Sequence, residues 1–227
     1  MVVMAAPQKF NVSEIAAELD EPFSINNVAF VGDIVVGVYN CQGTMEWHRH
    51  LDIDELFWVY AGTMALESEW GEVRLRPGEL AVVPKGIGHR SSAAARASVL
   101  LLRCGLMPQR KNGRRRLYAT SGEASLKRVG LHSAVQALVE PFQFQSVAQV
   151  EDSVVQAAWG EGVWPVESPA SHDALFFVLK GTATVRTAES MQHLHPGDLI
   201  VVPQGIPYQL STTQGTALVR LTREQVP

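Results

Sequence analysis

Three histidines and one glutamate in the first half of the chain have the spacing of metal ligands. His48 and His50 are two residues apart, so in a β-strand both side chains face the same side. Glu55 follows at the start of an apolar run, and His89 comes just after a Pro-x-Gly turn. If the four side chains converge, they form a mixed nitrogen and oxygen site that leaves coordination positions open for water or substrate.

An open metal site has a short list of chemical uses. It can polarise a carbonyl, activate water, orient a substrate or, with a redox-active ion, bind dioxygen. Glu55 is the predicted catalytic residue, either as a ligand that shifts or as a base near the metal. Alternation along the strand turns Phe57 inward, as a candidate wall of a substrate pocket or as a plain core residue. The same alternation predicts that Glu46 and Ser91 face inward and that Arg49 faces outward.

The elements that must position these residues occur twice in the chain. Residues 77–88 and 196–207 share eight of twelve positions, and residues 54–63 and 173–182 share six of ten, both at an offset of 119. Average residue usage gives roughly one or two matches over that length. The chain is therefore a tandem duplication of one structural unit.

The second copy lacks the ligand set. At the offset of 119 its equivalent positions hold Glu167, Pro169, Ala174 and Tyr208. Proline and alanine offer no donor atom, so we expect that the second copy has lost its metal and that the chain binds one ion. Such a copy can persist because it covers an exposed sheet edge of its partner. The alternative is that it still binds a ligand through Tyr208.

A second His-x-His pair in the chain is out of register with the first. His193 and His195 correspond to Arg74 and Arg76, and the apolar Leu194 between them is the predicted inward residue. We therefore expect both histidines to face solvent.

Each copy has the pattern of a mainly β unit preceded by a short helix. Residues 11–19 and 131–139 have helical patterns. Short runs rich in β-branched, aromatic and leucine residues follow, separated by glycine, proline or polar clusters, which is typical of a sandwich, barrel or jelly roll. In the first copy the predicted strands are 34–39, 55–62, 72–76, 79–84 and 97–103.

Two longer motifs carry a resemblance to a known family. The cupin superfamily has a first motif G-x5-HxH-x3–4-E-x6-G, and here Gly43 to Gly62 reads GTMEWHRHLDIDELFWVYAG, with the first spacer one residue shorter. Its second motif is G-x5-P-x-G-x2-H-x3-N, and here Gly78 to Ala93 reads GELAVVPKGIGHRSSA, with Ala93 in place of the final asparagine. The chain resembles a bicupin, with both halves covered and the metal motif only in the first.

This resemblance implies an all-β protein of two tandem cupin jelly-roll barrels. It implies one divalent transition metal per chain, held by His48, His50, Glu55 and His89. Iron, manganese, nickel, cobalt and zinc all suit this ligand set. Cupins with these ligands include dioxygenases, isomerases, decarboxylases and lyases, and the fold alone does not choose among them. The resemblance also implies a homodimer.

The expected domains are an N-terminal metal-binding barrel at 1–106, a basic linker at 107–129 and a degenerate C-terminal barrel at 130–227. Arg110 to Arg116 make the linker strongly basic, so it is either a solvated connection or an anion-binding loop. The chain is 46% hydrophobic with a formal net charge of −4, which gives no reason to expect a nucleic-acid or membrane partner. Sparse cysteines and the lack of a signal-peptide pattern favour a cytoplasmic protein.

Three hypotheses of function follow. The first is a metal-dependent oxidoreductase or isomerase that acts on a small polar metabolite. The second is a metal-dependent protein that binds or senses a small molecule without turnover, favoured by the lack of an obvious general acid outside the ligands. The third is a scaffold whose metal is structural.

Overall fold

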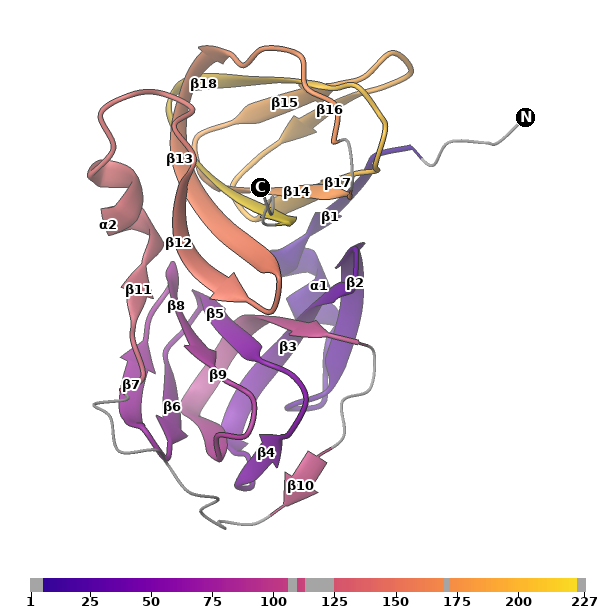
Figure 1. Ribbon diagram of the computed structural model, residues 1–227. Helices are drawn as coiled ribbons and strands as arrows, with labels where there is room; N and C mark the ends of the chain where they lie inside the picture. Colours follow the sequence, from indigo (N-terminus) through magenta and orange to yellow (C-terminus); the bar gives the residue numbers. More distant parts are fainter. Residues whose placement is uncertain (1–5, 106–109, 113–124, 170–171, 224–227) are drawn as a thin grey trace. The chain divides into compact units, whose positions relative to one another are not determined.

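The structure is a computed structural model that describes residues 6–105, 110–112, 125–169 and 172–223. The chain divides into two compact units. The first unit, here called the first barrel, comprises Ser13–Val28 and Asp33–Gly130. The second unit, or second barrel, comprises Met1–Val12, Ala29–Gly32 and Leu131–Pro227. Both are built almost wholly from antiparallel strands (Figure 1), which confirms the predicted mainly β fold.

Ten strands of the described residues form one sheet, and all of them belong to the first barrel except the last three residues of β2, which are grouped with the second. They are β2 (Ile25–Val31), β3 (Ile34–Thr44), β4 (His48–His50), β5 (Glu55–Ala61), β6 (Met64–Ser68), β7 (Gly71–Leu75), β8 (Glu79–Val83), β9 (His89–Cys104), β10 (Arg110–Asn112) and β11 (Val129–Gly130). The long strand β9 pairs with β3, β4, β5 and β6, and register shifts in its pairings with β3 and β5 mark bulges. Bulges bend a strand, so β9 can serve both faces of a small barrel.

Gly62 shows why the turn after β5 needs glycine. Its φ is 79°, a left-handed value that costs glycine little. A Cβ there would lie 2.7 Å from the carbonyl oxygen of Arg96 and 2.8 Å from Cα of Ala97. The turn therefore lets β5 reverse while staying against β9.

The second barrel repeats this plan with eight described strands. They are β1 (Gln8–Asn11), β12 (Gln145–Val150), β13 (Ser153–Val163), β14 (Ala174–Lys180), β15 (Ala183–Arg186), β16 (Met191–Leu194), β17 (Asp198–Val202) and β18 (Gln209–Arg223). Two short helices, α1 (Val12–Glu18) and α2 (Leu131–Gln136), begin near the start of each copy, as the sequence predicts. No helix among the described residues is long and apolar enough to cross a membrane.

The two copies also place their short first strands in equivalent ways. Strand β1 pairs with β17 in the second barrel, with Phe10 opposite Leu199. Strand β11 pairs with β8 in the first barrel, with Val129 opposite Leu80. These two pairs differ by the repeat offset of 119, so each barrel includes the strand that precedes the helix of the other copy.

This strand arrangement bears on the domain limits. The structure groups residues 1–12 and 29–32 with the second barrel, whereas the sequence analysis drew single cuts at 106 and 130. Those limits stay a prediction. The proposed linker, 107–129, falls largely outside the described residues; within it, Arg110–Asn112 form β10, which pairs with β4.

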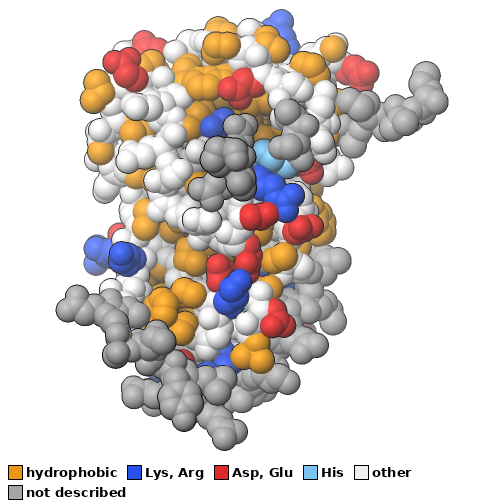
Figure 2. All heavy atoms as spheres, in the orientation of Figure 1, with side chains coloured by type: hydrophobic (Ala, Val, Ile, Leu, Met, Phe, Trp, Pro, Cys, Tyr) orange, Lys and Arg blue, Asp and Glu red, His pale blue; other side chains and the backbone are white. Residues whose placement is uncertain are grey.

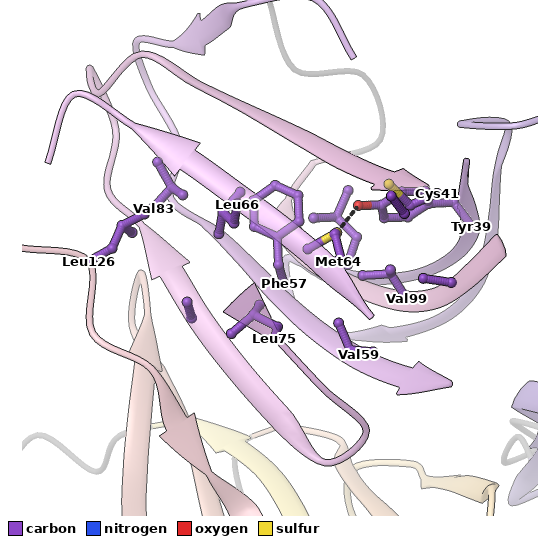
Figure 3. Close-up of a cluster of buried hydrophobic side chains, with 14 residues drawn as sticks. Tyr39, Cys41, Phe57, Val59, Met64, Leu66, Leu75, Val83, Val99 and Leu126 are labelled. Carbon is purple, nitrogen blue, oxygen red and sulfur yellow. Dashed lines mark hydrogen bonds between the residues drawn. The ribbon is translucent and has the colours of Figure 1, made fainter. Parts of the chain in front are cut away.

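Each barrel encloses its own hydrophobic core. Figure 3 shows the cluster in the first barrel, where Phe57 points toward Leu66 and Met64, and the Tyr39 hydroxyl donates to Met64 Sδ over 3.4 Å. The face of the molecule in Figure 2 carries described acidic and basic side chains in an interspersed pattern. The presence of both signs on that face agrees with the modest net charge.

Candidate metal centre

The structure brings the four predicted ligand residues together inside the first barrel. His48 and His50 lie on β4, Glu55 begins β5 and His89 begins β9. All four are buried, and one candidate ligand atom from each lies within 4.8 Å of the others. Direct pairing of His48 with His89 across β4 and β9 fixes two of the donors.

Backbone carbonyls orient two of the imidazole rings. His48 Nδ1 lies 2.8 Å from the carbonyl oxygen of Glu46, and His89 Nδ1 lies 3.0 Å from that of Ile87. A carbonyl can only accept, so each Nδ1 carries the hydrogen and donates it. Both rings therefore turn Nε2 toward the cluster, the arrangement by which outer hydrogen bonds commonly fix metal-binding histidines.

Glu55 contacts two of the three histidine donors directly. Its Oε2 lies 3.0 Å from His89 Nε2 and 3.2 Å from His50 Nε2. Burial raises the pKa of the Glu55 carboxyl, but hydrogen bonds from His50 and His89, with their charges, outweigh burial and hold the pKa well below its usual range. The group is therefore a carboxylate at neutral pH, as a ligand must be.

The donor set fits a bound cation. Because His89 Nδ1 donates its hydrogen to Ile87, the other ring nitrogen, Nε2, faces the Glu55 carboxylate at 3.0 Å. Two electron-rich atoms at that distance need a positive charge between them, either a proton or a metal ion. Donors bound at about 2.1 Å to adjacent positions of an octahedral ion lie about 3 Å apart. The separations of Glu55 from His50 and His89 match that value.

A small cavity adjoins the donor set. Its lining is mostly apolar, with hydroxyl groups from Tyr39 and Ser91: Phe23, Ile25, Tyr39, Met45, His48, Glu55, Phe57, Ser91 and Leu101. The space for centres of water-sized molecules is about 20 Å³, enough for about one water. Phe57 lines this cavity and also belongs to the core, with its ring 5.7 Å from that of His89.

The inward alternation holds for Ser91 but not for Glu46. Ser91 lines the cavity, as predicted. Glu46 is exposed, so the prediction that it faces inward is wrong. Glu46 precedes β4 and lies outside regular strand, so the two-residue period does not reach it. It contributes its backbone carbonyl instead.

An ion pair beside the cluster was missed by the sequence analysis. Arg49 lies between the two histidines of β4 and faces away from the cavity, yet it is buried. Its Nη2 lies 3.2 Å from Oε1 of Glu69, which sits in the turn between β6 and β7. No periodic pattern connects these two positions, because the turn reaches β4 only through the folded barrel.

The second barrel fills the equivalent space with different groups. Glu167 and Tyr208 form an isolated bridge that matches the His48 and His89 pair at the offset of 119. The Tyr208 hydroxyl donates to Glu167 Oε2 over 2.9 Å, and Arg220 Nη1 lies 3.7 Å from the same oxygen. Among the residues that the structure describes, no cluster of His, Cys, Asp and Glu donors comparable to the first site occurs in this barrel.

The off-register histidines face solvent, as predicted. His193 and His195 are exposed, whereas Leu194 between them is fully buried. His193 Nδ1 pairs with the hydroxyl of Thr184, 3.0 Å away. The strand period thus separates a true cluster from a sequence look-alike.

Comparison with protein families identifies both halves of the chain. A family model described as a cupin domain matches residues 36–102 and again 158–222. The chain is also 31% identical over 87 residues to an uncharacterised protein of Bacillus subtilis, YdbB, covering 38% of this chain and 77% of that protein.

Solved structures share the whole two-barrel architecture. A cupin 2 conserved barrel domain protein from Leptotrichia buccalis matches with a TM-score of 0.70 at 12% identity, covering 99% of this chain and all of that one. A salicylate 1,2-dioxygenase from Pseudaminobacter salicylatoxidans matches with a TM-score of 0.75 at 14% identity, covering 96% and 84%. At such identities the likeness shows the fold alone.

Proposed function

Because the chain belongs to the cupin domain family and carries that domain twice, we propose that it is a metal-dependent enzyme whose reaction takes place in the first barrel. The proposed reaction is dioxygenase-like or isomerase-like and acts on a small polar metabolite. One divalent transition metal per chain is held by His48, His50, Glu55 and His89.

One observation carries this proposal. The four donors converge, and a small cavity lined by two of them, His48 and Glu55, adjoins the cluster. Three imidazoles with one carboxylate also leave coordination positions for an outside ligand. A metal used only for folding is normally enclosed by its protein ligands. The cavity beside the donors therefore favours chemistry or binding over a purely structural metal.

The residues of the chain supply binding and orientation. A metal held there supplies Lewis acidity and, when redox-active, electrons for dioxygen chemistry. His48 and His89 keep their rings fixed through the carbonyls of Glu46 and Ile87. Burial raises the pKa of the Tyr39 phenol, so this hydroxyl stays protonated. Its hydrogen, which is donated weakly to Met64 Sδ in this structure, can turn instead to a substrate oxygen.

Glu55 serves best as a ligand in this scheme. Its depressed pKa makes the carboxylate a weak base, which favours the ligand role over that of a general base. Phe57 stands as the proposed apolar wall for the substrate. The similar salicylate 1,2-dioxygenase has been solved as an adduct with gentisate, which supports including small aromatic compounds among the substrates to be tried.

The second candidate function is metal-dependent binding of a small molecule without turnover. The cavity favours it in one respect: apart from the ligand residues, the described lining offers only the hydroxyls of Tyr39 and Ser91 as polar side chains. A reaction that needs a strong acid or base has no such group in that lining.

Metal analysis followed by dioxygen-uptake and metabolite assays tests the proposal. We expect about one transition-metal ion per chain and consumption of dioxygen or of a small metabolite. A metabolite that raises the melting temperature and is recovered unchanged after long incubation supports the binding function instead. Protein that holds metal, consumes nothing and gains no stability from any metabolite contradicts both.

A further inference from the structure

We propose that the Arg49–Glu69 ion pair is a positioning element for the metal centre, which holds the His48–His50 strand and the turn before His89 in the geometry that the ion requires. This inference rests on the proposed metal site. It assigns a role to two residues that are not themselves among the four donors.

The pair is almost fully buried and closely bonded. The side chains of Arg49 and Glu69 are only 3% and 10% exposed. Arg49 Nη2 donates to Glu69 Oε1, and the other carboxylate oxygen, Oε2, accepts from the backbone N–H of Gly88 over 3.0 Å. Such charge-assisted bonds are stronger and more directional than bonds between neutral groups.

The contacts join the two segments that carry the histidine ligands. Arg49 Nη1 approaches the carbonyl oxygen of Gly86 at 3.4 Å. The Glu69 N–H donates to the carbonyl oxygen of Gly88, so Glu69 holds Gly88 through both its backbone and its side chain. Gly88 directly precedes His89, and Arg49 lies between the two histidines of β4. A shift at either end of the pair therefore moves a ligand.

The absence of a side chain at Gly88 makes this close approach feasible. A Cβ at that position would lie 3.2 Å from Cδ and 3.3 Å from Oε1 of Glu69, and 3.4 Å from Nη2 of Arg49. These distances are tight for carbon, so a larger residue pushes the pair away from the turn.

The second barrel shows whether the fold itself requires this ion pair. Its equivalents of Arg49, Glu69 and Gly88 are Ser168, Ala188 and Pro207. Neither the ion pair nor a glycine is retained there.

The turn itself nevertheless keeps its backbone bonds. Gly205 N–H donates to the carbonyl oxygen of Pro169, matching the bond from Gly86 to His50 in the first barrel. The turn forms without the ion pair, and the pair occurs in the barrel that has the ligands. The pair is therefore better explained by the metal centre than by folding of the turn.

Metal titration of the full chain with three variants tests this role. Glu69→Gln keeps the shape and removes the charge, and Arg49→Lys keeps the charge and loses the forked geometry. Glu67→Gln is the matched control, because Glu67 and Arg90 form a 2.8 Å ion pair on the neighbouring strands, with side chains 27% and 33% exposed. Affinity for Co²⁺ and Zn²⁺ is measured by competition with a chelator, alongside the Co²⁺ absorption spectrum.

We expect Glu69→Gln to weaken metal affinity by about 10- to 100-fold, the usual cost of losing an outer partner of a metal ligand. The Co²⁺ spectrum should shift because the ligand angles change, and Arg49→Lys should show a smaller loss. Glu67→Gln should bind metal like the unaltered protein. Urea unfolding of the metal-free variants reports folding separately from binding.

Two results overturn the inference. One is a Glu69→Gln variant with unaltered affinity and spectrum. The other is a loss of affinity that Glu67→Gln reproduces or that the metal-free unfolding free energy fully accounts for. If Glu69→Gln does not fold, the same comparison between Arg49→Lys and Glu67→Gln decides. Failure of the unaltered protein to bind metal contradicts the proposed function instead, so the two failures are distinguishable.

Discussion

The two barrels share a strand plan but fill the same interior space with different chemistry. In the first, His48 and His89 face each other beside Glu55 and a small cavity. In the second, Glu167 and Tyr208 take the paired positions and bond to each other. The fold therefore forms around either set, which means that folding alone does not explain the donors of the first barrel.

The second barrel also replaces part of the cavity lining, with two aromatic rings and one cation. Phe144 and Trp164 stand where the first barrel has Ile25 and Met45, and their rings are 5.5 Å apart. Arg220, the equivalent of Leu101, places its guanidinium carbon 4.1 Å from the centre of the Phe144 ring. Aromatic and cation–π contacts of this kind stabilise an interior without metal.

Loss of the His50 imidazole should have the largest effect on the difference in metal binding between the two barrels. We expect His50→Ala to reduce bound metal from about one ion per chain to none, because the remaining donors no longer surround the ion. Glu167→Gln, in the second barrel, should leave the stoichiometry unchanged. Metal content after dialysis measures both. Two ions per chain in the unaltered protein would contradict this difference, because the second barrel would then also bind metal.

Exchange of Leu101 and Arg220 between the barrels should have the next largest effect. Leu101→Arg puts a charge into the apolar cavity beside the donors, and we expect it to cost about 3–5 kcal/mol of unfolding free energy and to weaken metal binding. Arg220→Leu removes the contact with Phe144 and the ion pair with the partly exposed Glu167 carboxylate, and should cost only about 1–2 kcal/mol. Urea unfolding measures both, and equal costs would mean that the two interiors do not differ in this way.

The sequence predicted most of the candidate metal site because its four residues lie in two short motifs and on strands with a clear period. His48 and His50 share a strand, and Glu55 and His89 begin strands beside turns, so period and repeat register place all four. The Arg49–Glu69 pair could not be predicted in this way, because Glu69 belongs to neither motif and its turn, between β6 and β7, reaches Arg49 only in the folded barrel. Alternation turned Arg49 outward correctly, but only tertiary packing shows that it is buried.

The strands also show what local sequence can and cannot predict. The predicted strand runs match β3, β5, β7, β8 and β9 to within a few residues except at the start of β9. That strand begins at His89, well before the predicted run at 97–103, because its polar and alanine-rich first half is held by pairing with β6 rather than by its own propensity. The short strand β11 has too few residues to carry any pattern.

Tyr208 gives a smaller and pH-dependent difference between the barrels. Tyr208→Phe removes the hydroxyl that donates to Glu167 and should cost about 1 kcal/mol at neutral pH. Burial raises the pKa of the Tyr208 phenol above its usual value, and the Glu167 charge raises it further.

The sign of the pH dependence follows from that shift. Above about pH 10 the unfolded tyrosine loses its proton while the folded one keeps it, so the contribution of Tyr208 falls as pH rises. The stability gap between the unaltered protein and Tyr208→Phe should therefore narrow above that pH in urea unfolding. A gap that widens would show that Tyr208 is ionised in the folded barrel.

The smallest effect is expected from substitution of the off-register histidines, His193 and His195. This substitution tests whether the repeat register identifies the metal ligands correctly. A double variant, His193→Ala with His195→Ala, removes the one other His-x-His sequence in the chain. Both side chains are exposed, and the His193 ring bonds to the hydroxyl of Thr184 at the surface. We expect unchanged metal content and a change in unfolding free energy of no more than about 0.5 kcal/mol. Metal lost from this variant but retained by His50→Ala would reverse the assignment, because the site would then follow sequence spacing rather than the inward face of a strand.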